Sequence, residues 1–194
     1  MKDKIINAAL EVFSQKGYNA SLNDISNIVG IKKQSLYNYF ENKEALFKEV
    51  VKYEINTYLK FLMQEINMYK SEKTELFFKK LFYSIINHFN TPEKLKFWRV
   101  LLILENNNFS EDSFKIIKDA EIIFIGEISS VFKEKFDERK MEAVSIENIY
   151  QTYLIMMHGV LDTALFYNHL ISKEELLESV WTVYWNSVKT YAFE

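Results

Sequence analysis

The amino-acid sequence predicts an all-α protein, in which an N-terminal three-helix helix-turn-helix head is joined by a long fourth helix to a larger helical body. The 194 residues include only four glycines and one proline, which leaves little room for hairpins or a loop-rich β architecture. Apolar residues recur at helical spacing along most of the chain, and 48% hydrophobic content suffices for a sizeable core. We expect a head over residues 1–47 and a body over residues 48–194.

The first helix is predicted over residues 3–16, with an apolar stripe and a stop at Gly17. The second begins after Ser21, which can cap it, because Asp24 three residues later completes a capping box. It ends at Gly30, a residue free to adopt a positive φ.

The third helix is predicted from about Lys32 to Phe40. Leu36 and Phe40, four residues apart, would face inward. At about 100° per residue, Gln34 and Asn38 would point outward. Lys33, Ser35, Tyr37 and Tyr39 would flank them. An outer face of amides, hydroxyls and lysines suits the major groove of DNA.

A fourth helix is predicted from Asn42, a good N-cap, to Tyr69, about 40 Å of helix. It is too long for a three-helix head alone and would join head to body. Further helices are predicted at about 72–90, 92–106, 111–136, 146–169 and 172–193. Pro92 suits a first helical position, and Ser172 begins a second capping box.

Composition limits the function classes. No apolar run approaches the ~20 residues of a membrane span, and the N-terminus is amphipathic rather than a signal peptide. The absence of cysteine excludes a disulfide framework and is compatible with the cytoplasm, where we expect the protein. The histidines are few and scattered, so we expect neither a metal site nor a cofactor. Those histidines are His88, His158 and His169.

The net charge of −3 is unevenly distributed. The first 50 residues carry seven lysines against six acidic residues, so the excess of negative charge lies in the remainder of the chain. A slightly acidic protein with a locally basic head favours specific, dimer-assisted binding of DNA over a general coating of it.

A chain of spaced positions in the first 47 residues resembles the N-terminal domain of the tetracycline-repressor (TetR) family. These are Gly17-Tyr18, Ile25…Val29-Gly30-Ile31, Ser35-Leu36-Tyr37-x-Tyr39-Phe40 and Asn42-Lys43-Glu44-x-Leu46. The resemblance implies a homodimeric transcriptional regulator that binds a pseudo-palindromic operator in double-stranded DNA, most simply a repressor released by a small molecule. Gln34 stands where the family often has glycine, so operator preference cannot be inherited.

The resemblance also implies roles for individual residues of the head. Positions matching Lys33, Gln34, Ser35 and Asn38 tend to face bases, and those matching Ser21, Tyr37, Tyr39 and Lys43 tend to hold phosphates. Glutamine and asparagine can pair with adenine, and lysine can donate to guanine. Lys32 is a further phosphate candidate, and Asn23 could reach a base edge. Ordinary solvated surface is the alternative for each of them.

The two terminal helices, 146–169 and 172–193, carry apolar residues on more than one face. That excess predicts a homodimer interface in the form of a four-helix bundle, the arrangement that TetR-like proteins use.

Aromatic residues make up 16% of the chain, and the body has a few polar-capable residues among apolar ones. An apolar cavity with few polar anchors would suit a lipophilic or aromatic effector. The candidates for that site are His88, Trp98, Glu105, Tyr150, Tyr153, His158 and Asp162. A hydrogen-bonded core or a dimer interface is the alternative for each.

Two other functions compete with a ligand-responsive repressor. One is an enzyme, for which His158 and Asp162, four residues apart, are the only acid–base pair worth naming; we expect no catalysis. The other is a DNA-binding regulator without a small-molecule effector, either an activator or a factor controlled by a partner protein.

Overall fold

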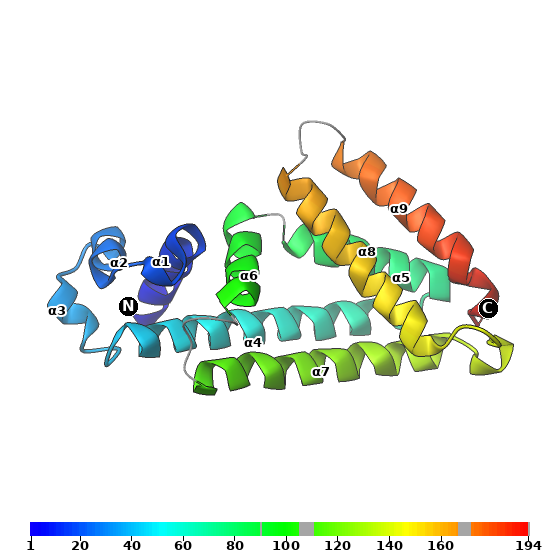
Figure 1. Ribbon diagram of the computed structural model, residues 1–194, viewed down its shortest axis with the longest axis horizontal. Helices are drawn as coiled ribbons and strands as arrows, with labels where there is room; N and C mark the ends of the chain where they lie inside the picture. Colours follow the sequence, from blue (N-terminus) through cyan, green and yellow to red (C-terminus); the bar gives the residue numbers. More distant parts are fainter. Residues whose placement is uncertain (90, 105–110, 167–171, 194) are drawn as a thin grey trace. The chain divides into compact units, whose positions relative to one another are not determined.

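The fold is taken from a computed structural model of the chain, which describes residues 1–89, 91–104, 111–166 and 172–193. Over these ranges the regular structure is helical, apart from one isolated bridge between Phe136 and Ala192 (Figure 1). The predicted all-α class, with a helix-turn-helix head and a helical body, is confirmed.

The chain divides into two compact units. Unit 1 is formed by Met1–Lys60 with Asn90–Glu121, and unit 2 by Phe61–Phe89 with Ile122–Glu194. The helices of unit 1 are α1 (Lys2–Lys16), α2 (Leu22–Val29), α3 (Lys33–Leu36) and α6 (Pro92–Leu104). Those of unit 2 are α5 (Thr74–His88), α8 (Ile146–Phe166) and α9 (Lys173–Val188). Both α4 (Lys43–Tyr69) and α7 (Glu111–Lys135) contribute to each unit. The predicted domains 1–47 and 48–194 remain a prediction.

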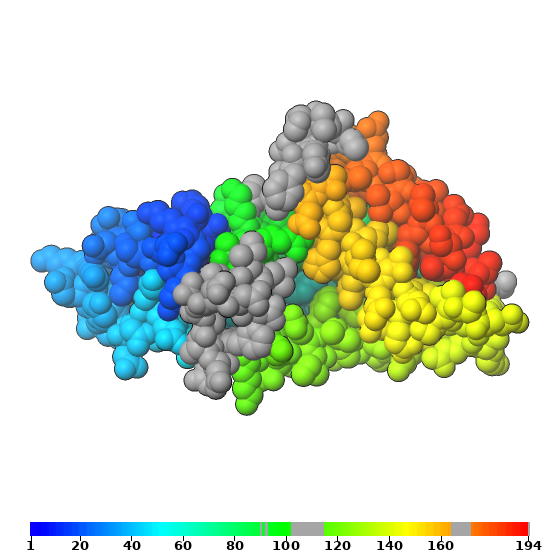
Figure 2. All heavy atoms as spheres, in the orientation of Figure 1, coloured from blue at the N-terminus to red at the C-terminus, as the bar shows by residue number. Residues whose placement is uncertain are grey.

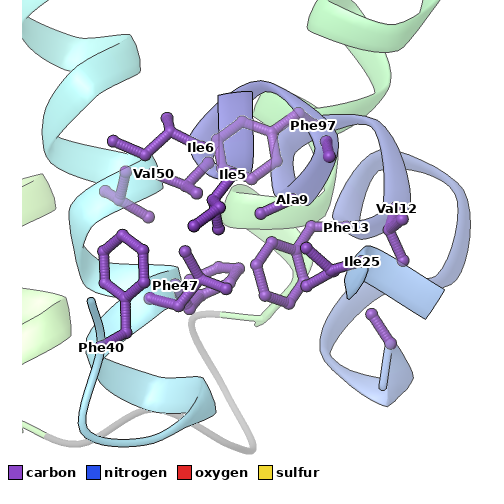
Figure 3. Close-up of a cluster of buried hydrophobic side chains, with 14 of the residues drawn as sticks. Ile5, Ile6, Ala9, Val12, Phe13, Ile25, Phe40, Phe47, Val50 and Phe97 are labelled. Carbon is purple, nitrogen blue, oxygen red and sulfur yellow. The ribbon is translucent and has the colours of Figure 1, made fainter. Parts of the chain in front are cut away.

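The core of unit 1 forms where α1 packs between α2, α4 and α6 (Figure 3). Phe13 from α1 meets the Phe47 ring of α4 edge-on at 4.8 Å, and Phe97 from α6 lies 6.1 Å from that same ring. Ile5 and Ile25 are fully buried beside them. The stripe predicted for α1 therefore does bury its apolar side chains, and α1 holds the head together.

The predicted third helix is too long. The α-helix ends at Leu36, because the amides of Tyr37, Asn38 and Tyr39 bond to carbonyls only three residues back. These tight turns advance about 120° per residue, so the 100° wheel does not hold beyond Leu36. The fifth helix is also shorter than predicted, beginning at Thr74 and ending at His88. The predicted helix ends near 106 and 169 lie outside the described residues.

The core of unit 2 is an aromatic lattice built by α5, α7, α8 and α9. Phe78 lies 4.3 Å from Phe132, 5.5 Å from Phe136 and 5.8 Å from Tyr153, between ring centroids. The C-terminal segment is tied to this core, because the backbone amide of Phe193 donates to Lys135 and the hydroxyl of Thr74 donates to the Phe193 carbonyl.

Candidate nucleic-acid interface

The first part of the candidate interface is the capped start of α2. The Ser21 hydroxyl accepts a hydrogen bond from the Asp24 amide at 3.2 Å, while the Ser21 amide donates to the Asp24 carboxylate at 3.1 Å. This is the capping box that the sequence predicted. Lys16 adds an ion pair at 2.8 Å and, with the Ser21 hydrogen bonds, lowers the pKa of Asp24 to about 2. The α2 start is therefore held by a network of short contacts.

The turn between α2 and α3 is made by Gly30, which adopts φ 77° and ψ 32°. Its amide and that of Ile31 both donate to the Ser26 carbonyl at 3.0 Å, which closes the end of α2. The left-handed conformation requires glycine here, as the sequence predicted. This turn sets the direction in which α3 leaves α2.

The segment from Lys32 to Tyr39 lies at the surface (Figure 2, light blue), and most of its side chains are polar. Eight of the ten predicted DNA contacts are exposed, and Ser35 and Lys43 are half-buried. Tyr37 and Tyr39 are 50% and 43% exposed, which is unusual for such large rings. Leu36 and Phe40 are buried beneath them, as predicted. The exposed residues are Ser21, Asn23, Lys32, Lys33, Gln34, Tyr37, Asn38 and Tyr39.

The start of α4 borders this surface. Asn42 caps the helix, because its side-chain oxygen accepts from the Ala45 amide at 2.8 Å. The Lys43 ammonium donates to the Tyr18 carbonyl at 2.7 Å and lies 4.2 Å from the centre of the Tyr18 ring. Lys43 therefore contacts Tyr18 within the head, and its position in the sequence did not predict this contact. Its predicted phosphate contact remains a prediction.

The residues predicted for an effector pocket are divided between the two units, and the pocket itself remains a prediction. Tyr153 is fully buried and its hydroxyl donates to the Phe78 carbonyl at 3.1 Å, so it is part of the unit 2 core. His88 stacks on Phe61, with ring centroids 4.2 Å apart. Of the remaining candidates in unit 2, Tyr150 and Asp162 are half-buried and His158 is exposed. Trp98 belongs to unit 1, and Glu105 lies outside the described residues.

A polar group that the sequence analysis missed is Glu54 on α4, which is only 3% exposed. Trp98 gives it a hydrogen bond and Lys94 acts on it electrostatically, yet burial has the larger effect and raises the pKa of Glu54. Its burial could have been predicted from its position on α4, because Glu54 lies on the same helix face as Val50 and Val51, which are both buried.

Among the described residues, no helical segment combines the length and the apolar character of a membrane span. No cluster of three or more potential metal-ligating side chains occurs among the same residues.

The family described as bacterial regulatory proteins, tetR family, matches residues 5–50. The chain is also 46% identical over 65 residues to the biofilm operon icaADBC HTH-type negative transcriptional regulator IcaR of Staphylococcus epidermidis. That match covers 33% of this chain and 35% of the relative. The IcaR protein of Staphylococcus aureus is 49% identical over 53 residues, which cover 27% of this chain and 28% of the relative. The chain thus matches about a third of the length of these relatives.

Solved structures match nearly the whole chain at low identity and so show the fold. A transcriptional regulator from Rhodococcus sp. Rha1 has a TM-score of 0.78 at 12% identity, covering 98% of this chain and 97% of that one. FadR of Bacillus subtilis, in complex with stearoyl-CoA, has a TM-score of 0.72 at 15% identity. That match covers 95% of this chain and 97% of FadR. A putative transcriptional regulator from Saccharomonospora viridis, in complex with choline, has a TM-score of 0.77 at 10% identity. That match covers 100% of this chain and 98% of the other.

The match over residues 5–50 coincides with the capped α2, the Gly30 turn and the polar segment after it. The resemblance drawn from the sequence is confirmed there, and the fold of the chain is that of the solved structures above. Its N-terminal segment, residues 5–50, is therefore similar to the TetR family of bacterial regulatory proteins.

Proposed function

We propose that this protein is a homodimeric transcriptional repressor that reads a pseudo-palindromic operator with the surface formed by residues 21–43. The observation that carries the proposal is the exposed set of amides, hydroxyls and lysines on a TetR-family head. Gln34 and Asn38 supply amides for base edges, while Tyr37, Tyr39 and Lys32 supply donors for phosphate oxygens. IcaR, which the head matches, is named a negative regulator, and this supports repression.

The proposed homodimer forms through α8 and α9. Ile155 on α8 and Val183 on α9 are 72% and 71% exposed in the single chain, which is unfavourable for side chains of this type in water. A Cβ added at Gly159 would meet no atom within 4 Å, so a partner helix has room to approach. His158 is exposed next to it, which fits the dimer alternative better than an interior pocket. Two heads would then enter successive major grooves about 34 Å apart.

We further propose that a small lipophilic or aromatic molecule releases the repressor. Two proteins of the same fold are described as complexes, one with stearoyl-CoA and one with choline, which supports a small-molecule effector. Such a molecule acts only if it binds the released conformation more tightly than the DNA-bound one. Helix α4 contributes residues to both compact units, so it is the element that we expect to transmit the change.

Fluorescence anisotropy tests the proposal. The purified protein is titrated into labelled DNA from upstream of its own gene, with scrambled DNA as competitor, at two salt concentrations. Tight binding that resists the competitor, with a stoichiometry of one dimer per operator, is the expected result. Binding no tighter than to scrambled DNA contradicts it for this operator. Stable binding that no ligand reverses points instead to regulation without an effector.

A further inference from the structure

We infer that Lys43 is a positioning residue, which joins the two ends of the DNA-reading segment and acts on the operator through Tyr18 instead of through a phosphate. The inference rests on the proposed function, since it assigns a role within the same surface of residues 21–43. It is carried by the contact of the Lys43 ammonium with both the carbonyl and the ring of Tyr18.

The Lys43 side chain makes two contacts with this one residue. Its ammonium donates to the Tyr18 carbonyl at 2.7 Å, and it lies 4.2 Å from the centre of the Tyr18 ring, within the range of a cation–π interaction. The side chain is half-buried, so both interactions are partly shielded from water and are stronger than at an exposed site. Moving the ammonium out to a phosphate oxygen would break both of them.

Tyr18 is also held by the core of unit 1. Its ring meets the ring of Phe47 edge-on at 5.6 Å between centroids, and the Phe47 ring meets that of Phe13 at 4.8 Å. Lys43 and Phe47 are four residues apart on α4, so they lie on the same face of that helix. The first two turns of α4 therefore hold Tyr18 with a cation and an aromatic ring together.

The place of this contact in the chain relates it to the reading of DNA. Tyr18 belongs to η1 (Gly17–Asn19), the short 3₁₀-helix that leads into the Ser21 cap of α2. Lys43 is the first residue of α4, directly after the segment that contains α2, α3 and the exposed tyrosines. The contact spans 25 positions and closes the reading segment into a loop whose two ends are fixed together. It thereby sets the direction of that segment relative to α4.

A residue with this role affects the recognition of bases more than the attraction to the phosphate backbone. Base readout requires side-chain amides, such as those of Gln34 and Asn38, to meet base edges at hydrogen-bond distance. Non-specific binding depends mainly on the number of phosphates that are neutralised and carries no information on the bases. Loss of the Lys43 ammonium is therefore expected to lower affinity for the operator and to leave affinity for other DNA unchanged.

Three lysine variants of the full-length protein test the inference. Lys43→Met keeps an apolar side chain of similar length and removes the ammonium. Lys32→Met shows the effect of a lost phosphate contact, because Lys32 is exposed on the reading surface. Lys52→Met is the matched control, because Lys52 is exposed on the same helix as Lys43, about 13 Å further along it. Fluorescence anisotropy measures the affinity of each for the operator and for scrambled DNA at several salt concentrations.

We expect Lys43→Met to bind the operator about tenfold more weakly, with unchanged affinity for scrambled DNA and an unchanged slope of log K against log salt concentration. Lys32→Met should weaken binding to both DNAs and reduce the magnitude of that slope by about 0.9. Lys52→Met should behave like the wild type. Two results overturn the inference: Lys43→Met binds the operator like the wild type, or it reproduces Lys32→Met in both affinity and slope.

Tyr18→Leu separates positioning from a direct phosphate contact, because it removes the ring and leaves Lys43 in place. We expect weaker operator binding at an unchanged salt slope. Unchanged operator affinity would contradict the inference, since a lysine that only holds a phosphate does not need the ring. Circular dichroism melting of both variants, with binding measured well below the melting temperature, shows that a lost affinity is not lost folding.

The same titrations separate this inference from the proposed function. A wild type that binds the operator no tighter than scrambled DNA contradicts the proposed repressor and, with it, the positioning role. A wild type that prefers the operator, together with a Lys43→Met variant that behaves like Lys32→Met, keeps the repressor and assigns Lys43 to a phosphate.

Discussion

Two tyrosines of unit 1 and two of unit 2 lie in opposite environments. In unit 1, Tyr37 and Tyr39 stand on the turn after α3 and are about half exposed. In unit 2, Tyr153 and Tyr184 are buried, and their hydroxyls donate to the carbonyls of Phe78 and Ile149 at 3.1 and 3.3 Å. Burial also raises the pKa of Tyr184. The hydroxyl is available to a partner molecule in the first case and is used by the protein's own backbone in the second.

Aromatic abundance is therefore not a signature of a ligand site. The aromatic rings of unit 2 contact one another closely, and the two tyrosine hydroxyls within that lattice already have acceptors. Glu54 of unit 1, by contrast, is a buried carboxylate whose pKa is raised by burial.

The largest expected effect tests the lattice itself. Phe78→Ala removes a fully buried ring that contacts Phe132, Phe136 and Tyr153. We expect the free energy of unfolding to fall by about 3–5 kcal/mol, measured by urea denaturation. A loss of less than about 1 kcal/mol would mean that the rings of unit 2 are not closely packed, and the contrast between its buried aromatic core and the exposed tyrosines of unit 1 would be wrong.

A second prediction tests the outward-facing side. Gln34→Ala should reduce discrimination at one base pair by about 1–3 kcal/mol, whereas Tyr37→Ala should weaken binding to all sequences alike. Both residues are exposed, so the free energy of unfolding should change by less than about 0.5 kcal/mol in either variant. Anisotropy against a set of single-base operator variants is the measurement. Identical behaviour of the two variants would contradict the division into base and phosphate contacts.

The turn that orients α3 is tested by Gly30→Ala. A Cβ at Gly30 would meet no atom within 4 Å, so its cost is the left-handed backbone alone, about 1–2 kcal/mol of unfolding free energy. Gly126→Ala is the control, since Gly126 lies within α7 and also has open space around it. That substitution should stabilise by about 0.5–1 kcal/mol. Equal effects in thermal melts would show that φ at Gly30 is not the reason for glycine.

Tyr153→Phe sharpens the contrast between the two kinds of tyrosine. It removes the hydrogen bond to the Phe78 carbonyl and should cost about 0.5–1.5 kcal/mol of unfolding free energy. Tyr37→Phe should leave that free energy unchanged and weaken DNA binding. If the two variants exchanged these behaviours, Tyr153 would belong to a binding site and not to the core.

The smallest expected effect concerns Asp24, whose pKa is lowered to about 2. The ordinary aspartate value is about 3.9, so its contribution is fully present above about pH 4 and is lost as the pH falls through about 2. Asp24→Asn should therefore flatten the dependence of stability on pH between these values. Urea denaturation at several pH values measures it, and an unchanged slope would assign the pH dependence to other carboxylates.

Local patterns predicted much of the head. The Ser21–Asp24 capping box and the Gly30 turn follow from residues three to six positions apart, and each was found as expected. The length of α3 was overestimated, because the change from four-residue to three-residue hydrogen bonds after Leu36 leaves no signal in apolar periodicity.

The candidate pocket could not be predicted in the same way. His158, Tyr153 and Trp98 look alike in sequence, as polar-capable residues among apolar ones. The structure places the first on the surface, the second in the unit 2 core and the third beside Glu54 in unit 1. Which of these positions a residue occupies depends on helices far away in the sequence, and a pattern within one helix carries no information about them.

Local patterns were sufficient to predict the all-α class, the order of the helices and the family resemblance of the head, because caps, glycine stops and 3.6-residue periodicity are properties of neighbouring residues. Which polar groups meet depends instead on the packing of distant helices. Lys43 reaches the Tyr18 carbonyl across 25 positions, Tyr153 reaches Phe78 across 75, and Glu54 meets Trp98 between α4 and α6. Such contacts depend on how whole helices pack, which is fixed by burial of the complete apolar surface and not by any single segment.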